Sequence, residues 1–88
     1  MGLIIMIYKI VFEKQAQKFL DKQDKNTRLR LYKAISKLPE GSDIKKLKGY
    51  SLYRLRVGDF RIIYTIDEVI RLIDIENIYN RGDVYKNL

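Results

Sequence analysis

The chain has 88 residues, 47% of them hydrophobic and 33% charged, which is the composition of one small folded domain and excludes a disordered chain. It has no cysteine and no histidine, so disulfides, thiolate metal sites and catalysis by an imidazole are excluded. The formal net charge of +7 at pH 7 favours nucleic acid, an anionic surface or an acidic protein as partner.

The N-terminal part predicts a strand and then a short helix. Residues 2–7 are apolar, but this run is far too short to span a bilayer and lacks the basic region and cleavage site of a signal peptide. We expect it to lead into an edge strand over residues 7–12. Residues 13–22 predict a helix, because their apolar side chains recur at helical spacing.

A second helix is predicted from an N-cap at Asp24 to about Leu38, with Pro39 and Gly41 ending it. Residues 42–50 then form a basic connector. The helical side chains expected in the core are Phe19, Leu20, Leu31 and Ile35.

Residues 53–64 alternate apolar and polar side chains around Gly58 and Asp59, which predicts two antiparallel strands joined by a two-residue turn. In this register Arg56 lies opposite Arg61, with Arg54 two residues along on the same face. Like charges that face each other destabilise a sheet, so such a pair usually has an anion or a partner's carboxylates between its members. The other pairs expected are Val57 with Phe60, Leu55 with Ile62, and Tyr53 with Tyr64.

The last predicted strand covers residues 69–79, after a second two-residue turn at Asp67 and Glu68. That turn would place Ile66 opposite Val69 and Arg61 opposite Asp74. Residues 80–88 form a polar tail. The predicted order is therefore βααβββ plus a C-terminal tail. This is a single α+β domain over residues 1–88, in which two N-terminal helices cover the apolar face of a small antiparallel sheet.

Arg54, Arg56, Arg61, Arg81 and Tyr85 form the candidate site. Arg81 follows the last strand directly, so a small sheet could bring it alongside Arg61. Several arginines around one phosphate would stabilise the charge that develops during phosphoryl transfer. A tyrosine could stack on a base or hold an oxygen by a hydrogen bond.

Basic side chains are densest in residues 45–61, where six stand against one acidic residue. Lys45, Lys46 and Lys48 would hold the backbone of a nucleic acid through salt-sensitive contacts.

At this point the candidate residues could also be ordinary surface residues without a functional role. Arg61 could simply pair with Asp74 or Glu76, since charges on the open face of a sheet are usually only solvated. The three lysines could lie in a solvated loop, and Tyr85 could be a surface residue of the tail.

Together these segments resemble the RelE/ParE superfamily of bacterial and archaeal toxins. The resemblance covers nearly the whole chain and implies a curved antiparallel sheet, two N-terminal helices and a cognate antitoxin that wraps the toxin. The matching residues are Lys48-Gly49, the stretch from Tyr53 to Tyr64, and Asn80-Arg81-Gly82-Asp83-Val84-Tyr85.

RelE-type members cut messenger RNA in the decoding site of the ribosome without a metal or other cofactor, leaving a 2′,3′-cyclic phosphate and a 5′-hydroxyl. Resemblance to them implies a cytoplasmic endoribonuclease whose partners are an antitoxin, the ribosome and mRNA, with no membrane. ParE-type members instead inhibit DNA gyrase and are not nucleases. The nuclease is the first hypothesis and the gyrase inhibitor the second. A basic nucleic-acid-binding module without toxicity is the third.

The resemblance also implies roles for single residues. Arg61 and Arg81 match arginines that bind the scissile phosphate, and Tyr85 matches a tyrosine that stacks on the nucleotide. Arg54 and Arg56 stand where well-studied RelE members carry lysines. Because arginine stays protonated and is a poor general base, we expect Arg56 to stabilise charge, with proton removal falling to another group or to ribosomal RNA.

Overall fold

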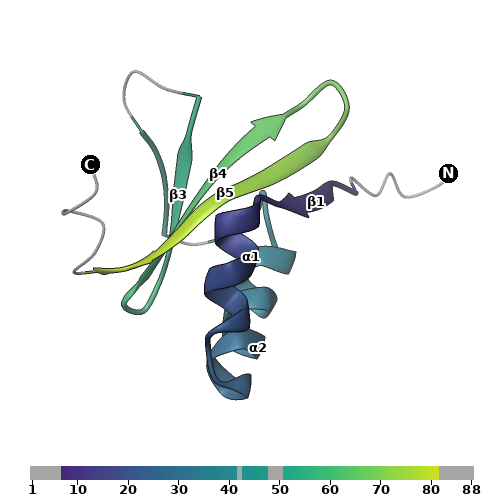
Figure 1. Ribbon diagram of the computed structural model, residues 1–88. Helices are drawn as coiled ribbons and strands as arrows, with labels where there is room; N and C mark the ends of the chain where they lie inside the picture. Colours follow the sequence, from purple (N-terminus) through teal and green to yellow (C-terminus); the bar gives the residue numbers. More distant parts are fainter. Residues whose placement is uncertain (1–6, 42, 48–50, 82–88) are drawn as a thin grey trace, which may run out of the picture.

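The computed structural model describes residues 7–41, 43–47 and 51–81, and it contains two helices and a five-stranded sheet in these residues. The strands lie in the order β1-β5-β4-β3-β2, with β1 parallel to β5 and all other neighbours antiparallel. Both helices cover one face of the sheet (Figure 1). The elements are β1 (Lys9–Phe12), α1 (Lys14–Asp21), α2 (Lys25–Ser36), β2 (Ile44–Lys46), β3 (Tyr53–Val57), β4 (Phe60–Asp67) and β5 (Leu72–Asn80).

Both helices form where the sequence predicts them. Asp24 caps α2, its carboxylate accepting a hydrogen bond from the Thr27 amide at 3.3 Å. Leu20 of α1 and Leu31 of α2 are fully buried, as their helical spacing predicts. Neither helix in the described part of the chain is long and apolar enough to cross a membrane.

The core lies between the helices and the inner face of β3, β4 and β5. Fully burying one leucine or isoleucine side chain contributes roughly 1.5–3 kcal/mol, so this single layer holds the domain together. The opposite face of the sheet carries no helix of the described residues and is the face of the arginines. The buried sheet residues are Leu55, Phe60, Ile62, Tyr64, Ile73, Ile75 and Ile78.

The β3–β4 hairpin has the predicted register. Arg56 pairs with Arg61, Leu55 with Ile62 and Tyr53 with Tyr64 across a turn at Gly58 and Asp59. Gly58 has a φ of +57°, in the left-handed region that favours glycine. The alternation of apolar and polar residues therefore decided both the turn and the two faces of this hairpin.

The prediction of a simple connector over residues 42–50 was wrong, because this segment contains the strand β2. Ile44 pairs with Leu55 and Lys45 with Arg54, which gives the order βααββββ instead of βααβββ. A strand this short carries too few residues for a period-two pattern. It forms because the edge of β3 offers unpaired backbone groups.

The prediction of a two-residue turn after β4 was also wrong. Asp67 pairs with Leu72, so four residues form the turn and Val69 is 92% exposed instead of facing Ile66. The Asp67 carboxylate accepts hydrogen bonds from the Val69 and Ile70 amides at 3.0 and 3.2 Å. This local side-chain bonding stabilises the longer turn.

A β-bulge interrupts the pairing of β4 with β5. Ile63 pairs with Asn77 but Tyr64 pairs with Ile75, which leaves Glu76 as the extra residue. Strict alternation from Ile75 would turn residues 77 and 79 toward the core. With the extra residue, Ile78 is buried instead and the side chains at 77 and 79 reach the open face.

Candidate functional site

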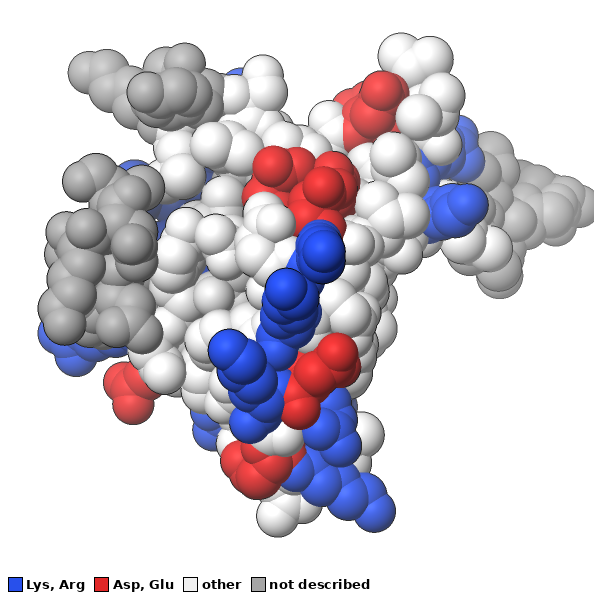
Figure 2. Space-filling view, in the orientation of Figure 1, with Lys and Arg blue, Asp and Glu red and all other residues white. Residues whose placement is uncertain are grey.

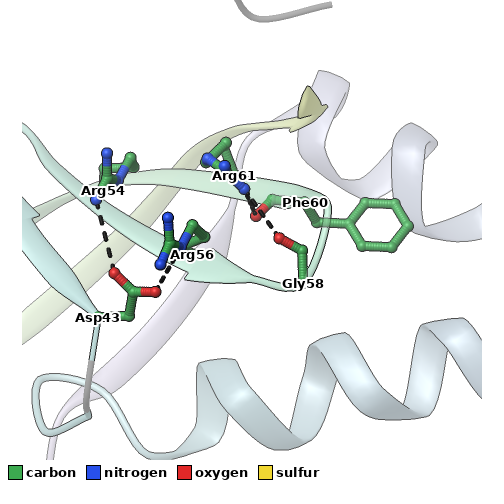
Figure 3. A network of polar contacts seen from close by, with 6 residues as sticks. All are labelled: Asp43, Arg54, Arg56, Gly58, Phe60 and Arg61. Atoms are coloured by element: carbon green, nitrogen blue, oxygen red, sulfur yellow. Dashed lines mark hydrogen bonds and ion pairs between the residues drawn. The ribbon is translucent and has the colours of Figure 1, made fainter. Parts of the chain in front are cut away.

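The arginines of the hairpin lie on the open face of the sheet, and two of them, Arg54 and Arg56, share the carboxylate of Asp43 (Figure 3). Arg56 Nε lies 2.5 Å from one oxygen of Asp43, and Arg54 Nη2 lies 3.7 Å from the other. The Arg56 amide also donates to the Asp43 carbonyl at 3.1 Å, which fixes the backbone of Asp43 beside β3. Asp43 thus offsets part of the repulsion that the sequence predicts between these arginines.

Arg61 is not held by a carboxylate of the residues that the structure describes. Its Nη1 donates to the carbonyl oxygens of Gly58 at 3.0 Å and Phe60 at 3.1 Å, and it forms no ion pair with any described residue. The sequence-based alternative that placed Asp74 opposite Arg61 was wrong, because the four-residue turn and the bulge place Tyr79 there. Arg61 therefore keeps most of its guanidinium donors available to an anion.

Arg81 reaches the same end of the sheet. Its amide donates to the Asp59 carbonyl at 2.6 Å, and the preceding residue, Asn80, pairs with Phe60. Arg81 comes directly after β5, so its backbone lies beside the turn of the β3–β4 hairpin. The backbone thus brings residue 81 next to Asp59, and the approach of its side chain to Arg61 stays a prediction.

The candidate lysines separate onto two faces. Lys45 pairs with Arg54 and shares the arginine face, whereas Lys46 pairs with Tyr53 on the other face, with its ammonium 5.9 Å from that ring. Lys48 and Tyr85 lie outside the described residues. The predicted RNA-binding set is therefore divided by the register of β2, a strand that sequence reasoning missed.

A hollow of about 260 Å³ opens beside the arginines. One side of the hollow is closed by Leu47, which follows β2, and Leu52, which precedes β3. The Leu47 amide donates a hydrogen bond to the Leu52 carbonyl at 2.8 Å. Sequence reasoning missed this hollow, because the bulge that turns its residues outward leaves no regular pattern. The lining residues are Gln15, Leu47, Leu52, Ile63, Glu76, Asn77 and Tyr79.

Three carboxylates lie beyond the hollow, where β1 meets α1. Oxygens of Glu13, Asp74 and Glu76 all lie within 4.8 Å of one another, a spacing that could hold a cation. A hydrogen bond with Asp74 raises the pKa of Glu13, and burial raises the pKa of Asp74. Because the raised pKa values favour a shared proton, the carboxyl groups can hydrogen-bond to each other without a cation.

The outer surface of the helix layer differs from the arginine face. Figure 2 shows Lys and Arg side chains along the helices with Asp and Glu side chains among them. On the arginine face, Asp43 is the carboxylate that pairs with the arginines within the described ranges. A surface with both signs interspersed attracts a polyanion less than a concentrated cationic cluster does.

The arginine face can bind phosphate and stabilise charge on it. Guanidinium groups offer paired donors that match two phosphate oxygens and stay protonated at any physiological pH. Asp43 was not among the candidate residues found from the sequence. Its φ of +74° is a conformation that aspartate and asparagine tolerate better than other side chains, so the signal was conformational and not visible in the pattern.

Comparisons with known proteins identify the family of the chain. The family model described as the ParE toxin of type II toxin-antitoxin system, parDE, matches residues 10–82. A curated relative, RelE1 of Methanocaldococcus jannaschii, is 45% identical over 49 residues, which are 54% of each chain. The chain thus spans about half the length of the curated relative it matches.

Solved structures share the fold over most of the chain. The RelE of the archaeal RelE–RelB complex from Pyrococcus horikoshii OT3 is 31% identical with a TM-score of 0.70, covering 85% of this chain and 96% of that one. The RelB–RelE antitoxin–toxin complex from Methanococcus jannaschii gives 28% identity and a TM-score of 0.74, over 89% and 98% of the two chains. The isolated E. coli RelE toxin, 20% identical with a TM-score of 0.71 over 92% and 94%, shows the same α+β fold.

Proposed function

The chain belongs to the ParE toxin family of type II toxin–antitoxin systems, and from its arginine face we propose that it is a RelE-like endoribonuclease that cuts messenger RNA on the ribosome. The observation that carries the proposal is the pairing of Arg56 with Arg61, whose side chain, among the described residues, binds only carbonyl oxygens and so is open to a phosphate.

In the proposed reaction the ribose 2′-oxygen attacks the adjacent phosphorus and the bond to the 5′-oxygen breaks. The 2′-hydroxyl loses its proton and the departing 5′-oxygen gains one, which gives a 2′,3′-cyclic phosphate and a 5′-hydroxyl. Arg61 and Arg81 bind the scissile phosphate and stabilise the charge that develops on its oxygens. Arg56 contributes charge but not proton transfer, because a guanidinium stays protonated. Tyr85 stacks on the nucleotide, and proton removal falls to a group outside the arginine cluster.

The RNA backbone and the antitoxin are proposed to use the same face. Arg54 and Lys45 hold neighbouring phosphates and Lys48 adds a weaker contact, whereas Lys46, on the other face, takes no part. The relatives from P. horikoshii and M. jannaschii are solved as toxin–antitoxin complexes, and we expect a cognate antitoxin here to set acidic side chains against the arginines. Translating ribosomes place the proposed activity in the cytoplasm.

The test is a cell-free translation reaction with a defined mRNA, in which primer extension maps breaks with and without ribosomes. We expect breaks at codon spacing that need ribosomes and disappear with Arg61→Ala and with Arg81→Ala. Lys33→Ala is the matched control, because it removes one positive charge from an exposed position on α2. Intact mRNA and unimpaired translation with the wild-type protein would refute the nuclease proposal.

Inhibition of DNA gyrase is the second candidate function. It is favoured by the match to the ParE family model and by the arginines at positions 54 and 56, where RelE members carry lysines. A supercoiling assay with purified gyrase separates the two candidates. Inhibition of supercoiling together with intact mRNA would establish the binding protein in place of the nuclease.

A further inference from the structure

The open face of the sheet changes from basic to apolar to acidic along its length. Arg54, Arg56 and Arg61 lie at one end, the hollow of about 260 Å³ in the middle, and the carboxylates around Glu76 at the other. A nucleotide has the same order of chemistry: an anionic phosphate, the flat apolar face of a base, and on adenine, cytosine and guanine an exocyclic amino group. The face is thus complementary in charge to one nucleotide unit.

Two cross-strand pairs join the arginines to the hollow. Arg61 lies directly opposite Tyr79, and Arg54 lies directly opposite Ile63. Directly opposed residues on one face have Cβ atoms about 4.5–5.5 Å apart, so a guanidinium and its opposed lining residue are neighbours. A phosphate bound by either arginine therefore brings its attached base over the hollow.

Tyr79 has the features of a stacking platform. Asn77 Nδ2 donates to its hydroxyl oxygen at 2.7 Å, while Asn77 Oδ1 accepts from the Ile78 amide at 2.9 Å. The ring is thus held from its far end by a side chain that is itself fixed to the backbone. A fixed aromatic ring binds a base with little loss of side-chain freedom, and every base has a face that can stack.

We propose that this hollow is a base-binding subsite in which one RNA base stacks on Tyr79 and donates its exocyclic amino group to Glu76. The subsite deepens the proposed function, on which it rests, by naming the base that lies beside the bound phosphate. Cytosine binds better than uracil, because uracil turns a carbonyl oxygen toward the carboxylate where cytosine turns an amine. An apolar side chain of a protein partner would fill the same space without using Glu76.

The test is direct binding of a short fluorescent oligouridylate, followed by anisotropy without ribosomes. One central position carries cytosine, uracil or an abasic site, so the phosphates stay constant. We expect the cytosine form to bind about fiftyfold more tightly than the abasic form, because the abasic form loses both the stacked base, worth about tenfold, and the amino contact, worth about fivefold. We expect it to bind about fivefold more tightly than the uracil form, as loss of one amino contact predicts.

Variants separate the parts of the subsite. Tyr79→Leu keeps an apolar side chain but removes the ring, and should bring the uracil and abasic forms to the same affinity, whereas Tyr79→Phe should keep the difference. Glu76→Gln should remove the preference for cytosine over uracil. Arg61→Ala should weaken all three forms equally, because it removes a phosphate contact and no base contact.

Equal binding of the cytosine and abasic forms by the wild-type protein would overturn the proposal. If Tyr79→Leu then weakened antitoxin binding, the hollow would belong to a protein partner. The experiments distinguish failure of the subsite from failure of the nuclease proposal. Base-dependent binding without cleavage of mRNA would refute only the nuclease proposal, and cleavage without base-dependent binding would refute only the subsite.

Discussion

Asp43→Asn tests whether Asp43 competes with phosphate for the arginines. The substitution removes the charge that pairs with Arg54 and Arg56 and keeps the size of the side chain. Asparagine also tolerates the φ of +74° at this position, so the backbone stays unstrained. We expect the variant to bind RNA more tightly than the wild-type protein and to be slightly less stable.

The magnitude follows from the geometry of the two ion pairs. A phosphate that bridges the same two guanidinium groups lies roughly 6 Å from the Asp43 carboxylate, where repulsion between unit charges in water is about 0.7 kcal/mol. Its removal should tighten RNA binding about threefold at low salt, and less as salt screens the charges. The side chain of Arg56 is 50% exposed and that of Asp43 37%, so the pairs resemble surface salt bridges. Losing them should lower the free energy of unfolding by less than about 1 kcal/mol.

The assay is a titration of a short single-stranded RNA at two salt concentrations, with urea denaturation for stability. Asp21→Asn is the matched control, because it removes the same charge from the end of α1 in the helix layer. RNA affinity that is equal in the two variants, or lower with Asp43→Asn, would refute the competition between Asp43 and phosphate.

Three further variants test the packing and the titrating groups. The hydroxyl of Tyr64 is buried without a hydrogen-bond partner among the described residues, so Tyr64→Phe should leave the free energy of unfolding unchanged or raise it by about 1 kcal/mol in urea denaturation. Burial also raises the pKa of Tyr64 to about 12, so the wild-type protein, but not this variant, should lose stability as the pH rises above 10.0, where the unfolded chain ionises first. Burial raises the pKa of Asp74 above 3.8, so the folded state favours the protonated carboxyl group. The free energy of unfolding should therefore fall as the pH rises through that raised pKa. Asp74→Asn should weaken this pH dependence in denaturation curves measured at several pH values. Gly58→Ala should lower the melting temperature through a backbone cost of roughly 1–2 kcal/mol, since a Cβ there would meet Arg30 only at an ordinary 3.5 Å; an unchanged melting temperature would contradict the strain.

The sequence predicted the parts of the fold in which local pattern and tertiary packing agree. The cap at Asp24, the buried leucines of the helices and the register of Arg56 with Arg61 all follow from spacing and turn chemistry. The strand β2 was not predictable in this way, because Ile44–Lys46 is too short to show a period and depends on the edge of β3.

The candidate site was only partly predictable for a related reason. The pattern identified Arg54, Arg56 and Arg61, because they alternate with apolar residues in a regular hairpin. It did not identify Asp43, which approaches them through a left-handed backbone conformation, or Tyr79, which faces Arg61 through a change of register. Long-range pairing decides both positions, and a single sequence carries no local signal for it.

The bulge at Glu76 joins the fold to the proposed chemistry. Regular pairing of β5 would turn Tyr79 toward the helix side of the sheet, away from Arg61. One extra residue reverses the faces from position 77 onward, while Ile78 takes the vacated place in the core at 2% exposure. The extra residue, Glu76, also places its carboxylate at the acidic end of the hollow. A single insertion in the ladder therefore brings the proposed stacking ring and the proposed acceptor for the base onto the face of the arginines.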